Sequence, residues 1–179
     1  MVLNFESIHE YGTTDSLDII NGYLEALAHF NTPQSDVGYT FFIQELPFKD
    51  LNLETVNKYY ELVDTYEVCS KFEVYKNLDE IQKIISQTIC HEAFSFLNYI
   101  SLKSTIDSFP VGMVTQDWRR VNYSDLLTEK ILNATQANEI LIQTEYSIRA
   151  TGKWYEIHWK DIFLKNSRAT FILHLGFSD

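Results

Sequence analysis

The feature that most constrains the fold is a set of three segments near the C-terminus, at residues 139–149, 153–164 and 168–177, in which apolar and polar side chains alternate. Alternation with a period of two residues is typical of β-strands, because successive side chains point to opposite faces of a sheet. Thr151-Gly152 and Asn166-Ser167 separate the segments, and both dipeptides are typical of turns. Strands joined by such short turns pair with antiparallel neighbours, so the sequence predicts a three-strand antiparallel meander.

Amphipathic helices are predicted before the meander, at residues of about 15–30, 53–66 and 78–103. Each range repeats apolar residues at the three- and four-residue spacing of one helix face. Asn77 and Glu80 have the spacing of a capping box at the start of the third helix. Weaker patterns predict strands at 38–46, 68–75 and 113–121, and a short helix at 124–132.

These elements predict a single α+β domain over residues 1–179, in which helices cover one face of an antiparallel sheet. A length of 179 residues suits one domain. Aromatic residues make up 15% of the chain, with only 3 Pro and 6 Gly, which is untypical of disordered chains.

The registers of the meander can be predicted from the positions that share the core. Apolar side chains occupy mainly odd positions in the middle strand, even positions in the strand before it, and odd positions in the last strand. A two-residue turn at Thr151-Gly152 places the apolar side chains of the first two strands on the same face. A three-residue loop at 165–167, with Asn166 in a left-handed conformation, does the same for the last two strands. His158 then lies opposite Glu145 on one side and His174 on the other.

The predicted row Glu145–His158–His174 lies on the polar face of the meander, and Arg149 opposes Trp154 beside it, as a cation–π pair would require. Two imidazoles and a carboxylate could hold a divalent metal or carry out acid–base chemistry. The same face could also bind a partner, since Trp, Tyr and Arg anchor many interfaces, or be only a solvated surface. We interpret it as a binding or solvated surface, and expect neither a metal nor a cofactor.

Motifs of specific chemistry are missing from the sequence. His91-Glu92 begins like a zinc-binding HExxH motif, but Ser95 stands where the second histidine should be. The sequence has no phosphate-binding glycine loop, dinucleotide fingerprint or nucleophile elbow. Arg119-Arg120 is the only dibasic pair, which is a small basic patch for direct nucleic-acid binding. These absences favour a binding protein over an enzyme.

Acidic residues are concentrated in the first part of the chain. Residues 1–110 carry 6 Lys and Arg against 17 Asp and Glu, which accounts for the whole net charge of −11, and the first 48 residues carry no Lys or Arg. Such a surface repels nucleic acid and anionic membranes and attracts basic partners. The predicted binding residues are therefore Asp15, Asp18 and Glu25 of the first helix, together with Trp154, His158, Glu145, His174 and Arg149 of the meander.

The sequence thus predicts a small acidic protein that acts by protein–protein binding, with its acidic helices at 15–30 and 53–66 against a basic partner surface. The narrowest form of this hypothesis is an inhibitor of toxin-neutralising or anti-defence type. Two alternatives stay open. One is a metal-binding or acid–base enzyme that uses Glu145, His158 and His174, and the other is a ligand-sensing domain with a pocket in its aromatic interior.

A cytoplasmic location is expected from three properties of the sequence. No apolar run reaches the ~18 residues that span a bilayer. The residues after Met1 are acidic where a secretion signal is basic. Cys69 and Cys90 form no CxxC pair and are expected to be small core residues in a reducing compartment.

Overall fold

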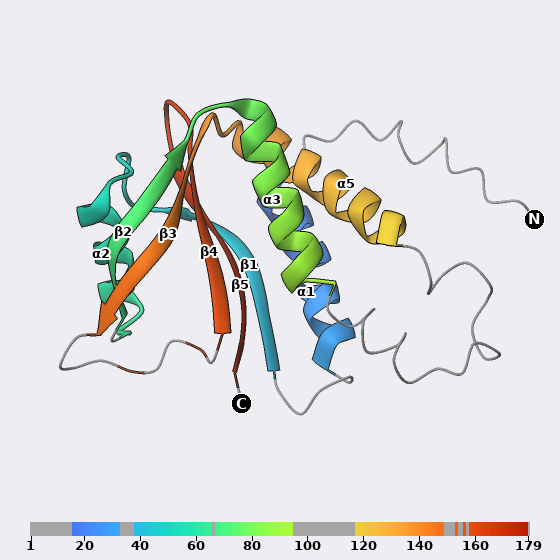
Figure 1. Cartoon of the computed structure of the whole chain (residues 1–179), viewed down its shortest axis with the longest axis horizontal. Coiled ribbons are helices and arrows are strands. Elements are labelled where there is room, and N and C mark those ends of the chain that lie inside the picture. Colours follow the sequence, from blue (N-terminus) through green and yellow to red (C-terminus); the bar gives the residue numbers. More distant parts are fainter. Residues whose placement is uncertain are drawn as a thin grey trace, which may run out of the picture.

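The computed structural model describes residues 16–32, 38–65, 67–94, 117–148, 153, 156 and 158–178, and it has an α+β fold (Figure 1). The described helices and strands are, in chain order, α1 (Leu17–Asn31), β1 (Gly38–Leu46), α2 (Leu53–Leu62), β2 (Glu67–Tyr75), α3 (Leu78–Glu92), α5 (Asp117–Thr135), β3 (Glu139–Ile148), β4 (His158–Lys165) and β5 (Thr170–Ser178). The predicted single α+β domain with a C-terminal antiparallel meander is confirmed.

Most element predictions hold, and one is wrong. Helix α1 ends one residue beyond its predicted range, at Asn31, whereas α2 and α3 begin as predicted and end early, at Leu62 and Glu92. Strands β1 and β2 lie at 38–46 and 67–75, and β4 begins at His158, later than the predicted 153. Residues 95–103 of the third predicted helix lie outside the described residues. The strand predicted at 113–121 is wrong from residue 117 on, because α5 begins at Asp117 and absorbs the short predicted helix. Side chains of Ser16, Asn52 and Asn77 accept backbone hydrogen bonds at the starts of α1, α2 and α3, so these helix starts follow local capping signals.

The sheet has the strand order β1-β5-β4-β3-β2, and every neighbouring pair is antiparallel. The first two strands in the chain are therefore the two edges, and the meander fills the middle. The connection through α2 carries the chain from one edge of the sheet to the other, and α3 and α5 connect β2 to β3 (Figure 1).

Helices cover both faces of this sheet, not one face as predicted. Helices α1, α3 and α5 pack on one face, around a cluster that includes Ile85, Ile131, Ile162 and Leu173. Helix α2 packs on the other face, around Tyr59, Tyr60, Phe163 and Ile172. Figure 1 shows α2 on one side of the strands and the other three helices on the opposite side. A strand buried on both faces carries consecutive apolar residues, so alternation no longer identifies its core face.

Both predicted registers of the meander are wrong by an odd number of residues. His158 pairs with Phe177, and His174 pairs with Asp161. On the other side of β4, Ile142 pairs with Ile162, so even positions pair with even ones, whereas the prediction paired even positions of one strand with odd positions of the other.

The loop between β4 and β5 explains the second error. It contains four residues, because Lys165 pairs with Thr170. The side chain of Asn166 closes it by accepting hydrogen bonds from the backbone N–H groups of Arg168 at 2.6 Å and Ala169 at 2.8 Å. This Asx turn needs no left-handed residue. Among the described non-glycine residues, positive φ occurs at Asp64 and Gln136, and the prediction for Asn166 is wrong.

Candidate functional site

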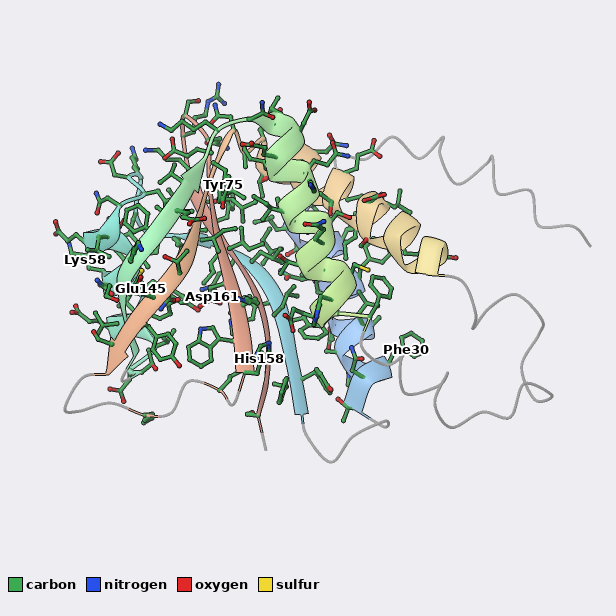
Figure 2. All side chains as sticks on the ribbon, in the orientation of Figure 1. Phe30, Lys58, Tyr75, Glu145, His158 and Asp161 are labelled. Carbon is green, nitrogen blue, oxygen red and sulfur yellow. The ribbon has the colours of Figure 1, made fainter. Side chains whose placement is uncertain are left out.

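The predicted row of Glu145, His158 and His174 does not form. His158 contacts Glu92 of α3, with 3.1 Å between Nε2 and Oε2, on the face covered by α1, α3 and α5. Glu145 pairs with Lys71 of β2 at 3.0 Å, and both side chains are about 60% exposed. His174 is buried on the α2 face. Figure 2 shows Glu145 and His158 well apart on the sheet. A metal or acid–base site built from these three residues is therefore excluded.

The other predicted binding residues divide into two groups. Asp18 and Glu25 lie exposed on α1, as expected. Asp15, Arg149 and Trp154 lie outside the described residues, so the proposed pair of Arg149 and Trp154 stays a prediction.

His174 is the centre of a buried polar cluster that the sequence did not predict. Its Nδ1 lies 2.6 Å from Oδ1 of Asp161 on the neighbouring strand β4. Its Nε2 lies 3.4 Å from Oε1 of Glu156, which precedes β4. The side chains of His174 and Asp161 are each only 1% exposed, and that of Glu156 is 9% exposed. The imidazole ring therefore bridges two carboxylates in the interior.

Tyr60 extends this cluster from the sheet to α2. Its hydroxyl lies 2.9 Å from Oδ2 of Asp161 and 2.7 Å from the side-chain amide of Gln143 on β3. A phenol has one proton to donate, and Asp161 is an acceptor only, so the proton belongs to the Tyr60–Asp161 bond. The Gln143 amide is therefore assigned with its Nε2 toward Tyr60, so that Nε2 donates to the phenol oxygen. This orientation also gives the buried Nε2, which otherwise has no partner, an acceptor. The result is one chain of bonds from Gln143 to Glu156.

The charges of the cluster follow from its geometry. Burial alone lowers the pKa of His174, but hydrogen bonds and charge attraction from Asp161 and Glu156 raise it to about 9. The ring is therefore a cation at neutral pH, and it stacks on Phe42 with 4.9 Å between ring centroids. Desolvation, followed by the charge of Asp161, raises the pKa of Tyr60 well above its usual value, so Tyr60 keeps its proton.

Gly176 makes room for the Glu156 carboxylate. A Cβ atom at this position would lie 1.7 Å from Oε2 of Glu156 and 2.8 Å from Nε2 of His174. Any larger residue here would push the carboxylate away from the imidazole. Close packing of the ion pair thus depends on a residue without a side chain.

The cluster ties the fold together and is not open to a substrate. Its carboxylates lie at opposite nitrogens of the ring, so they cannot share a metal ion with it. Over the described ranges, no three or more His, Cys, Asp or Glu side chains are placed to hold a metal. Because His174 is 1% exposed, the ring cannot reach a molecule in solvent. It links α2, β3, β4 and β5 through a single set of polar contacts.

The outer surface of α1 is a second candidate site. Ile19, Tyr23, Ala26 and Phe30 follow one line of the helix at spacings of four, three and four residues. The three large side chains on this line are 40%, 48% and 61% exposed. Asp18 and Glu25 lie on another exposed side of the helix, separated from this line by Gly22 and His29.

Helix α5 continues this apolar surface. Lys130 places its Nζ 6.0 Å from the centre of the Tyr23 ring, so this side of α5 faces α1. Leu126 and Tyr123 lie about one and two turns before Lys130 on the same side, and they are 47% and 59% exposed. We call the five residues Ile19, Tyr23, Phe30, Tyr123 and Leu126 the α1–α5 surface. The sequence contained its signal, since α1 has a second apolar line besides the one that enters the core.

The two acidic helices lie on opposite faces of the sheet. Helix α1 packs against the cluster around Ile85, whereas α2 packs against the cluster around Phe163. A flat partner surface would contact the outer side of one of these helices but not of both, and binding of the acidic helices to a basic partner stays a prediction. Of the described helices, none is long and apolar enough to cross a membrane.

Comparison with protein-family models, curated proteins and solved structures found no match to this chain.

Proposed function

We propose that the protein acts by binding another protein through the α1–α5 surface. The observation that carries this proposal is the exposed apolar line of α1, with large side chains at positions 19, 23 and 30. A row of exposed large apolar residues on one helix is costly in water, and contiguous patches of this kind mark interaction sites. Tyrosine and phenylalanine are also enriched at the centres of interfaces.

The charge around this surface supports a basic partner. Helix α1 carries Asp18 and Glu25 and has no Lys or Arg along its length. Glu129 of α5 is exposed next to Leu126, and Lys130 lies over the Tyr23 ring. A partner that presents an apolar patch with Lys or Arg around it would complement this arrangement. The same acidic field disfavours direct binding to nucleic acid.

The test is a pair of variants on opposite faces of the sheet. Changing Ile19→Ser together with Tyr23→Ser should weaken recovery of the partner from host extract by about tenfold or more, because large side chains that anchor an interface are each worth about 1–2 kcal/mol. Leu62→Ser is the matched control, since Leu62 is 66% exposed on α2. It should leave recovery unchanged. Quantitative affinity purification with mass spectrometry measures both.

Salt gives an independent check on the charge argument. Binding of the purified partner should weaken steeply as salt rises from about 50 to 500 mM, where charge interactions are screened over a few ångströms. Equal recovery of the partner with the Ile19→Ser, Tyr23→Ser variant and with Leu62→Ser would contradict the proposed surface. Recovery of an acidic partner, or binding that does not change with salt, would contradict the proposed partner.

Within this class, we propose an inhibitor that covers a basic working surface of its partner. The support is the small size of the chain and its net charge of −11, which matches partners that ordinarily contact nucleic acid. Such a partner should lose nucleic-acid binding when the wild-type protein is added, but keep it when the Ile19→Ser, Tyr23→Ser variant is added. We place this binding in the cytoplasm, where the absence of a disulfide between Cys69 and Cys90 is the ordinary state.

A further inference from the structure

Two asparagines contact the backbone of the two edge strands in the same way. On β1, the side chain of Asn21 accepts a hydrogen bond from the N–H of Ile43 at 2.7 Å and donates one to its carbonyl at 2.9 Å. On β2, Asn57 accepts from the N–H of Cys69 at 2.8 Å and donates to its carbonyl at 3.0 Å. Asn21 belongs to α1 and Asn57 to α2, so each edge is served by a helix on a different face.

A side-chain carboxamide has the same donor and acceptor as a peptide group. When it bonds both the N–H and the carbonyl of one residue, it occupies the position that a residue of a neighbouring strand would take. Because the backbone groups of Ile43 point to Asn21, they point away from β5. Those of Phe41 and Glu45, two residues to either side, face the same edge by the alternation of an antiparallel ladder. Asn21 thus sits at the middle of a three-residue pairing site.

The β1 edge has few of the other features that discourage pairing between molecules. Proteins usually protect an edge strand with lysine, proline, a bulge or short length. Strand β1 has nine residues, no Lys and no Pro, and its register with β5 runs without a shift. Strand β2, in contrast, has register shifts next to Lys71. Protection of β1 therefore depends far more on its asparagine.

The sequence of β1 is also compatible with pairing to itself. In an antiparallel pair of two β1 strands centred on Ile43, each Glu45 lies opposite a Phe41 of the other copy, since these numbers are equally far from 43. The residues of each copy whose backbone groups face outward, Phe41, Ile43 and Glu45, then pair with one another. The two Glu45 side chains are not directly opposite each other. Such an interface has two-fold symmetry and is closed, as in most homodimers.

We propose that the outer edge of β1 is a latent pairing surface for β1 of a second copy of this chain, and that Asn21 keeps it closed. The carboxamide satisfies Ile43 and excludes a second strand from the centre of the site. Asn57 does the same at β2, where the bulge and Lys71 also contribute. This surface is distinct from the α1–α5 surface, although Asn21 and Tyr23 belong to the same helix.

The test compares the molar mass of variants by size-exclusion chromatography with light scattering, over a range of protein concentrations. About 0.5 M salt screens the repulsion between copies of net charge −11. Asn21→Ala should shift the mass toward the dimer, and Asn57→Ala should do so less. Gly22→Ala is the matched control, because a Cβ there meets nothing within 4 Å. It should behave as the wild type does.

A second substitution separates edge pairing from association of unfolded chains. Glu45→Pro removes an outward N–H without touching the ladder to β5, so it should return Asn21→Ala to the wild-type mass. If Asn21→Ala does not fold, Asn21→Asp keeps the acceptor for Ile43 N–H and should give a partial shift. A folded Asn21 variant with unchanged mass would overturn the proposal. The proposal would also be overturned if the Asn21→Ala dimer persisted after Glu45→Pro was added. It would be overturned as well if the wild type were already a dimer that Glu45→Pro dissociates, because its β1 edge would then not be closed.

Discussion

Replacing Asp161 with asparagine should lower the free energy of unfolding by about 3 kcal/mol, because removal of one partner leaves a buried charge without its compensation. Asp161 is 4% exposed and bonds both His174 and Tyr60. Glu156 then remains as the one carboxylate of the cluster against the imidazolium, at the longer distance of 3.4 Å, and the N–H₂ group of the new amide faces a donor on at least one side. Urea unfolding followed by fluorescence measures the change, since the slope and midpoint give the free energy directly.

Two further variants make this expectation specific. Glu145→Gln breaks the exposed pair with Lys71 and should cost much less than Asp161→Asn, because solvent screens an exposed pair. Adding both His174→Gln and Glu156→Gln to Asp161→Asn should recover part of the loss, because neither a buried cation nor a buried carboxylate of the cluster is then left without its partner. A loss for Asp161→Asn no larger than that for Glu145→Gln would show that the buried cluster does not hold the fold together.

Stability should also fall as the pH rises from about 6.5 to 9, by an amount on the order of 3 kcal/mol. The pKa of His174 is about 9 in the folded chain, raised from 6.5. A group whose folded pKa is raised stabilises the fold fully below its unfolded pKa, and this contribution disappears as the pH passes through the folded value. The sign is thus opposite to that of a buried neutral histidine, which would favour the fold at high pH.

Unfolding free energies at several pH values between about 6 and 9 test this dependence. The pKa of Cys69 is raised to about 11, and that of Tyr60 is also raised, so both groups reduce the stability of the fold further above pH 9. The comparison should therefore stop near pH 9. His174→Gln should flatten the curve over this window. A wild-type protein whose stability is constant there, or a His174→Gln variant with the same slope, would refute the assignment of a charged His174.

The fold could be predicted from the sequence because its signals are local. Helix α3 shows this well, since Asn77 caps it and Ile81, Ile85 and Ile89 repeat on one buried face. The number and order of the strands in the meander likewise follow from turn residues and alternation. None of these inferences needs knowledge of what lies on the other side of the sheet.

The site could not be predicted because it depends on contacts between distant segments. Ile162, Phe163 and Leu164 are consecutive and all buried, so odd and even positions gave no usable difference. The Asn166 side chain, which closes a four-residue loop, decides that Asp161 meets His174. Tyr60 then comes from 101 residues away to complete the cluster. The available clue was the presence of one polar residue in each apolar run, Asp161 in β4 and His174 in β5.

The pairing of β1 with β5 has a consequence for how the chain is made. Gly38 pairs with Ser178 and Leu46 with Thr170, so the partners are separated by 140 and 124 residues of sequence. During synthesis from the N-terminus, β1 leaves the ribosome long before β5 exists. Contacts of such high sequence separation also form slowly. Through this interval the apolar side chains of β1 have only α1 and its neighbours to pack on, and the sheet is complete only after β5, the last of its five strands in chain order, has been translated.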